Sequence, residues 1–338
     1  MITRLEIQTK GGWLTTPWFD AFFLTAFPVV FLFFGDPYRT ASLVSTSILT
    51  MFLANMHLTG TLALVYLDRN ELRKKPFLYV WPPLILIGIL TTLRLEGLRN
   101  QASTLFFYGF IGHEIFQYYF ITRVFFLSRE RYPTIDALIS CTALVAGPVY
   151  CFLQSLNSFN YQYYGNVLSF HLNQNFLEGL RWCALFAMAV FVTRQIYIYA
   201  RYRKIAWFPL LMVLVSNCVF YVPIIILKSQ SLFFYASFRT HHALQYLAWI
   251  FIYCRLKYKG QIVKGAQFLS YLSLPRKGVY FFAFLIFLAS IALGASKIAK
   301  QNHHIVISEL LFLNLAAVHF YLDVMLWWNQ KRIIRTVM

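Results

Sequence analysis

Five histidines of this 338-residue chain lie inside strongly apolar segments. An imidazole surrounded by hydrocarbon costs free energy, so histidines kept in such segments commonly bind a metal or relay protons. Neutral imidazole is also the commonest metal ligand among protein side chains. The residue type and its setting therefore indicate metal chemistry inside an apolar structure. The five residues are His57, His113, His241, His242 and His319.

Three of these histidines are followed, four residues later, by another possible ligand or a side chain that could support a ligand. Residues i and i+4 share one face of a helix, so the two members of each pair can face the same cavity. A carboxylate in such a pair either binds a metal or orients an imidazole by accepting its second N–H. We expect the two glutamines to support the site through hydrogen bonds rather than as ligands. The pairs are His113 with Gln117, His241 with Gln245, and His319 with Asp323.

Three charged residues lie well inside these same segments. We expect the carboxylates of Glu114 and Asp323 to complete the metal's coordination or to adjust the basicity of the imidazoles. Arg239, one turn before His242, is expected to pair with a carboxylate or to hold an anionic group of the substrate. His241 and His242 are adjacent and point about 100° apart on a helix, so they need not both face the site.

The composition shows what must position these residues. Hydrophobic residues make up 59% of the chain and charged residues only 12%. A water-soluble domain cannot bury that much apolar surface, and apolar segments of about 20 residues recur along the whole length. We therefore predict an all-α fold, a polytopic integral membrane helix bundle that forms a single transmembrane domain over residues 1–338. The expected transmembrane helices, ten in number, cover 18–34, 43–67, 78–93, 102–122, 135–155, 174–200, 205–227, 232–254, 279–296 and 305–328.

Lysine and arginine concentrate in alternate connections between these segments. The positive-inside rule then places the N- and C-termini in the cytoplasm. A bacterial inner membrane is the expected location of the bundle. Residues 1–17 become a cytoplasmic N-terminal segment and 255–278 a basic cytoplasmic loop. The run 266–272 in that loop is amphipathic and could lie on the membrane surface, but we interpret it as part of an ordinary loop. Topology and anionic headgroups account for the net charge of +18, so nucleic acid is not an expected partner.

In this topology the segments that carry the five histidines all run from outside to inside. The histidines lie about 15–21 Å from the cytoplasmic boundary, at nearly equal depth near the middle of the membrane. Helices running in the same direction can therefore bring them together in one metal site. Iron is the expected metal, with zinc, copper and manganese as alternatives.

The depth of the site predicts a lipophilic substrate or O₂ as a reactant, because both partition into the bilayer. A membrane lipid or a lipophilic small molecule is then the expected partner, together with O₂ and a reductase. Aromatic side chains near the histidines either line a hydrophobic tunnel or simply pack among the helices. They are Phe116, Tyr118, Tyr119, Phe120, Tyr246, Phe320 and Tyr321.

Histidines on several membrane helices, with His319-Phe320-Tyr321-Leu322-Asp323 in the last segment, resemble the bacterial membrane carotene-cleaving oxygenases of the Brp/Blh type. The resemblance is confined to the histidine-bearing segments. It implies non-haem iron held by intramembrane histidines, and a polyene substrate that enters from the bilayer.

Our leading hypothesis is a membrane-embedded, histidine-ligated metalloenzyme, a non-haem iron oxygenase or related oxidoreductase acting on a lipophilic substrate. One alternative is a b-type haem protein that transfers electrons. Another is a proton-coupled transporter that uses the same polar residues as a relay. A zinc hydrolase is a weaker alternative, because Gln117 stands where an HExxH motif has its second histidine.

Overall fold

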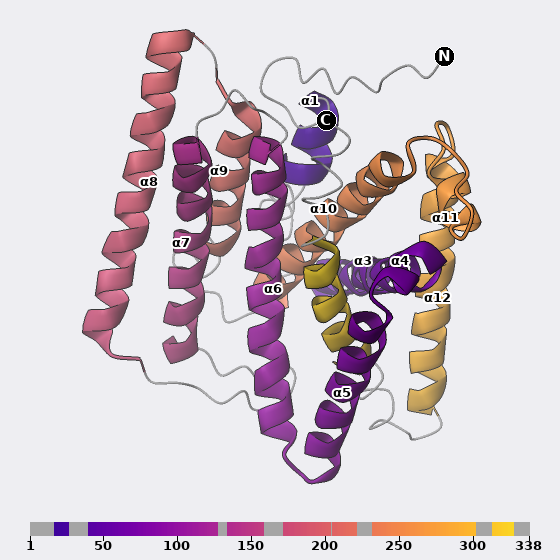
Figure 1. The fold of residues 1–338 in the computed structure, drawn as a ribbon. Helices are drawn as coiled ribbons and strands as arrows, with labels where there is room; N and C mark the ends of the chain where they lie inside the picture. The colour runs from indigo at the N-terminus through magenta and orange to yellow at the C-terminus, as the bar shows by residue number, and fades with distance from the viewer. Residues whose placement is uncertain are drawn as a thin grey trace. The chain divides into compact units, whose positions relative to one another are not determined.

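The computed structural model describes residues 17–26, 40–127, 134–158, 172–203, 205–221, 232–301 and 313–327. Over these ranges the chain is helical and contains no strand, which confirms the all-α prediction (Figure 1). The helices are α1 (Pro17–Phe19), the π-helical η1 (Asp20–Ala26), α3 (Thr40–Tyr66), α4 (Arg69–Lys74), α5 (Pro76–Leu95), α6 (Arg99–Leu127), α7 (Thr134–Ser158), α8 (Gln174–Tyr202), α9 (Trp207–Tyr221), α10 (Leu232–Tyr258), α11 (Gln267–Leu272), α12 (Gly278–Gln301) and a last helix over Leu313–Trp327.

Within the described ranges, four helices are long and apolar enough to cross a membrane. They lie within α5, α7, α8 and α12, over Pro76–Leu95, Thr134–Gln154, Gln174–Tyr202 and Gly278–Ile298. Each of the ten predicted segments overlaps a helix, but ten membrane spans remain a prediction. α6 and α10 are 29 and 27 residues long and carry the polar residues singled out above.

The chain divides into two compact units. The first comprises residues 1–46, 114–160 and 169–245, and the second comprises 47–113, 161–168 and 246–338. Three helices, α3, α6 and α10, contribute residues to both units. The units are therefore described one at a time.

In the first unit, α7 packs against both α8 and α9, and the three helices lie side by side in Figure 1. Arg194 of α8 donates a 2.6 Å hydrogen bond to the Asp136 carboxylate of α7. Asn217 of α9 donates to the carbonyl of Ala143 on α7, at 3.1 Å. Polar side chains thus cross-link helices that are largely apolar, as is common between membrane helices.

In the second unit, a buried cluster of charges joins the end of α10 to α4 and α5. The Lys257 ammonium lies 2.9 Å from Asp68 Oδ2 and 2.8 Å from Glu71 Oε2. Tyr258 donates to Asp68 and Tyr79 to Glu71, both at 2.9 Å. The other oxygen of Asp68 caps α4 by accepting backbone N–H groups. We call these five residues the Lys257 cluster.

The charges of the Lys257 cluster shift one another's pKa. Burial alone would raise the pKa of Asp68, but the Lys257 ammonium and a tyrosine hydroxyl outweigh it and hold this pKa below its ordinary value. The Lys257 ammonium and the hydroxyl of Tyr79 likewise lower the pKa of Glu71, although burial alone would raise it. Burial would lower the pKa of Lys257, but Tyr253 and the two carboxylates raise it. Each group is therefore stabilised in its charged form.

We expect Lys257→Met to lower the free energy of unfolding by about 3–5 kcal/mol, because it leaves two buried carboxylates without their cation. The matched control is Lys74→Met. Lys74 also contacts Glu71, but its side chain is 64% exposed, whereas that of Lys257 is only 10% exposed. The control should lose less than about 1 kcal/mol. Thermal unfolding of both variants in detergent measures the difference, and equal losses would contradict the assignment.

The pH dependence of this loss follows from the directions of the pKa shifts. Carboxylates with a lowered folded pKa contribute stability above their unfolded pKa, and this contribution disappears as pH falls through the folded pKa. An ammonium with a raised folded pKa contributes below its unfolded pKa and loses its contribution as pH rises through the folded value. The difference between wild type and Lys257→Met should therefore be greatest near neutral pH and shrink in both acid and alkali.

Candidate metal centre

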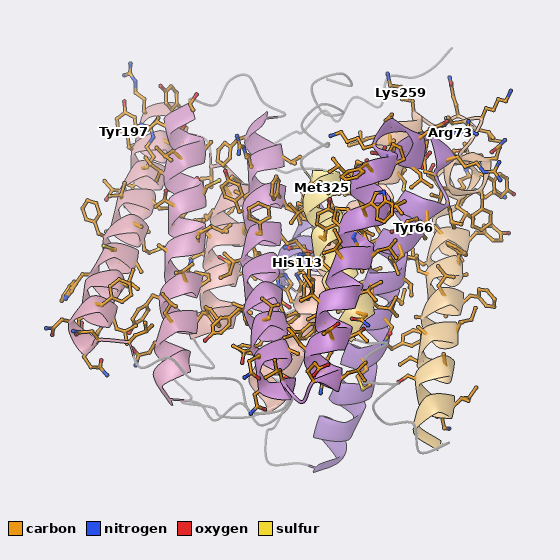
Figure 2. The ribbon with its side chains drawn as sticks, turned by 60° about the horizontal axis from the view of Figure 1, so that its bottom comes forward. Tyr66, Arg73, His113, Tyr197, Lys259 and Met325 are labelled. Atoms are coloured by element: carbon orange, nitrogen blue, oxygen red, sulfur yellow. The ribbon has the colours of Figure 1, made fainter. Side chains whose placement is uncertain are left out.

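Four of the predicted site residues converge in the second unit. His57 comes from α3, His113 from α6, and His319 and Asp323 from the last helix. Each offers one ligand atom, and the four atoms lie within 4.8 Å of one another. All four side chains are buried, and Figure 2 shows His113 midway along its helix. The group can hold a metal ion.

One oxygen of Asp323 faces all three imidazoles. Asp323 Oδ2 lies 3.4 Å from His113 Nε2, 3.5 Å from His57 Nε2 and 3.5 Å from His319 Nε2. Four ligands placed tetrahedrally at about 2.0–2.1 Å from an ion lie about 3.3–3.4 Å from one another. The distances from the carboxylate to the imidazoles therefore suit a single ion bound among these four side chains.

The other oxygen of Asp323 is held by two hydroxyl groups. Asp323 Oδ1 accepts hydrogen bonds from Tyr246 (2.6 Å) and from Thr61 (2.8 Å). The two hydroxyl oxygens also contact each other. Because both donors hold Oδ1, Oδ2 is the oxygen left to face the imidazoles. Such outer hydrogen bonds fix the orientation of a ligating carboxylate.

Thr61 also determines the tautomer of His319. Thr61 Oγ1 lies 2.8 Å from His319 Nδ1. A hydroxyl has one proton, and Thr61 donates it to Asp323, so His319 Nδ1 must be the donor to Thr61. The lone pair of His319 is then on Nε2, the nitrogen that faces Asp323 Oδ2.

The imidazole rings are also oriented by packing. The ring centroids of His57 and Tyr246 lie 3.8 Å apart. The rings of His57 and His319 meet edge-on, with their centroids 4.2 Å apart. His113 stacks on Phe320, with centroids 4.8 Å apart. Phe320 in turn packs against an apolar cluster of Leu58, Phe106, Leu313 and Ala316. The site thus has hydroxyl groups on one flank and an aromatic, apolar wall on the other.

The predicted residues that belong to the first unit have partners there. Tyr118 hydrogen-bonds to His241 Nδ1. Gln117 Nε2 donates to the carbonyl of His242 (3.0 Å) and to Gln245 Oε1 (2.9 Å). The two glutamines thus link α6 to α10 through hydrogen bonds, and their support of the metal site stays a prediction. The group of four possible ligands does not include His241 or His242.

The remaining predictions fall elsewhere. Glu114 is buried and belongs to the first unit. It follows His113 in the sequence, so its side chain points about 100° away from that of His113 on the helix. The side chain of Arg239, and the histidines at 171, 303 and 304, lie outside the described residues.

Sequence reasoning missed Thr61 and saw Tyr246 only as an aromatic side chain. A signal for Thr61 was present, because it follows His57 by four residues, the same spacing that paired His319 with Asp323. No comparable pattern marks the hydroxyl of Tyr246, which reaches Asp323 from α10.

No family model, curated protein or solved structure matches this chain. The candidate site therefore rests on its own geometry.

We expect Thr61→Val to weaken metal binding about 10–100-fold, the usual cost of removing an outer hydrogen bond at a metal site. Valine has nearly the shape of threonine but cannot bond to Asp323 or accept from His319. Thr61→Ser keeps the hydroxyl and should bind metal nearly as tightly as wild type. Competition against a chromophoric chelator, on variants that elute as a single species in detergent, measures the affinities. Wild-type affinity in Thr61→Val would show that this hydroxyl does not orient the ligands.

Proposed function

We propose that this chain is an integral membrane metalloprotein in which His57, His113, His319 and Asp323 bind one transition-metal ion. The observation that carries the proposal is the single carboxylate oxygen facing three imidazole nitrogens at 3.4–3.5 Å in a buried site. A buried carboxylate needs compensation by hydrogen bonds and positive charge. Two hydroxyl groups donate hydrogen bonds to one oxygen of Asp323. A cation among the imidazoles would neutralise the negative charge on the other oxygen.

Iron is our first choice of metal, and zinc, copper and manganese are the alternatives. Three imidazoles and one carboxylate suit several divalent transition metals, and iron adopts higher coordination numbers that leave positions open beyond four protein ligands. An iron ion held in this way would supply the site for oxygen chemistry. The role of the protein is then to hold the four ligands, to keep His319 in the right tautomer and to exclude water.

The proposed activity is that of a non-haem oxygenase or related oxidoreductase acting on a lipophilic molecule, with O₂ and a reductase as partners. The aromatic wall formed by Phe106 and Phe320 beside His113 supports an apolar substrate. The burial of the site among apolar helices supports access from the bilayer. The resemblance to the carotene-cleaving oxygenases makes a polyene one candidate within this class.

Several roles enter the proposal from the sequence alone. They are ligation by His241 and His242, catalysis by Glu114 and Arg239, and the cytoplasmic placement of both termini in a bacterial inner membrane. The metal content of variants at these four residues can be measured in the same way. Loss of metal in a variant would show that the residue contributes to metal binding.

The geometry favours a non-haem ion over the b-type haem alternative. Two axial imidazoles of a haem approach the iron from opposite faces of the macrocycle. Here three imidazole nitrogens face one carboxylate oxygen, and the rings of His57 and His319 lie only 4.2 Å apart. No observation on the described residues singles out the proton-coupled transporter.

Elemental analysis and an absorption spectrum test the proposal on the full chain purified without chelators. We expect stoichiometric transition metal in the wild type and its loss in His57→Gln, His113→Gln, His319→Gln and Asp323→Asn. His171→Gln, a histidine that the sequence places in a polar connection, should keep its metal. Absence of metal from the wild type, or its retention in all four variants, would overturn the proposal, and a Soret band would favour the haem alternative.

A further inference from the structure

Among the residues that the structure describes, one end of the second unit exposes basic charge without exposed acidic charge to balance it. Its two acidic residues, Asp68 and Glu71, are buried and paired with Lys257. The segment 246–301 contains no aspartate or glutamate at all. The exposed basic residues at this end are Arg69, Arg73, Lys74, Lys75, Lys259, Lys264 and Arg276.

Hydrogen bonds join the two segments that carry these charges. The backbone N–H of Arg69 donates to the carbonyl of Gly265 (2.9 Å), and Asn70 Nδ2 donates to the carbonyl of Lys264 (2.6 Å). The approach requires glycine at 265, where φ is +87° and a Cβ would lie 2.6 Å from Asn70 Oδ1. Figure 2 shows Arg73 and Lys259 at the same end, so the basic side chains of both segments form one surface.

Aromatic side chains are interspersed with these charges. The predicted loop contains the short helix α11, which buries Leu269 and Leu272 and exposes Phe268 and Tyr271. The Lys277 ammonium lies 5.1 Å from the ring centroid of Tyr271 and 4.7 Å from that of Tyr280. Basic groups mixed with exposed aromatic rings are typical of the membrane–water interface.

The two candidate membrane spans of this unit begin at this surface. α5 starts at Pro76, directly after Lys75, and α12 starts at Gly278, directly after Lys277. The basic groups therefore lie at the ends of apolar helices, at the level where lipid headgroups meet the hydrocarbon.

We propose that this surface binds the anionic headgroups of bilayer lipids. The Lys257 cluster contributes by keeping Asp68 and Glu71, the two carboxylates among the described residues of this region, buried and neutralised, so that they do not repel a phosphate. Attraction of this kind falls off within a Debye length and weakens as salt increases. The proposal is independent of the metal site.

The test uses the full chain reconstituted in a mixture of phosphatidylglycerol and phosphatidylcholine, followed by native mass spectrometry of the lipids that stay bound. We expect phosphatidylglycerol to be enriched over its share of the mixture, and the enrichment to decrease as salt is raised. Arg73→Gln/Lys264→Gln should reduce the enrichment several-fold.

The matched control is Arg201→Gln/Lys297→Gln, which removes the same charge from two exposed residues outside this surface. The control should retain the wild-type enrichment. Lack of enrichment in the wild type, or an equal decrease in both double variants, would overturn the proposal. Metal content is measured on the same proteins. If all of them contain the same amount of metal, a change in lipid enrichment cannot be attributed to the metal site.

Discussion

The buried carboxylate of Asp323 is the constraint on which the second unit depends. A carboxylate removed from water must find hydrogen bonds and positive charge, or it destabilises the fold. Asp323 meets this requirement by dividing its two oxygens, one toward the hydroxyls of Thr61 and Tyr246 and the other toward three imidazoles. Residues from α3, α6, α10 and the last helix converge on it, so the packing of four helices and the chemistry of the site have the same origin.

The four possible ligands could be predicted because helical periodicity and burial both act on them directly. A histidine or aspartate in an apolar segment is unusual enough to be noticed, and the i to i+4 spacing placed His319 and Asp323 on one face. Thr61 was harder to recognise, because a threonine hydroxyl in a helix often bonds only to the preceding turn. The hydroxyl of Tyr246 depends on the packing of α10 against other helices, which sequence spacing does not encode. The fold class followed from composition. The ten membrane spans stay a prediction, because in the described part of the chain four helices are long and apolar enough to cross a membrane.

The boundary between the two units crosses α6 between His113 and Glu114 and α10 between Gln245 and Tyr246. Adjacent side chains of a helix also point about 100° apart, so neighbours in the sequence need not face the same site. Depth was therefore an incomplete basis for predicting one shared site. Depth gives the position of a side chain along the helix axis but not its direction around that axis.

The presence of His57 and Thr61 on one turn of α3 has a consequence for how the centre assembles. The helix supplies a ligand and also the hydroxyl that orients two other ligands, His319 and Asp323. A rotation or displacement of α3 would therefore remove both contributions together, and a partly assembled bundle would have little affinity for an ion. If the centre binds an ion as proposed, metal uptake and the final docking of α3 would be a single cooperative event, in which the free energy of ligation becomes free energy of tertiary structure.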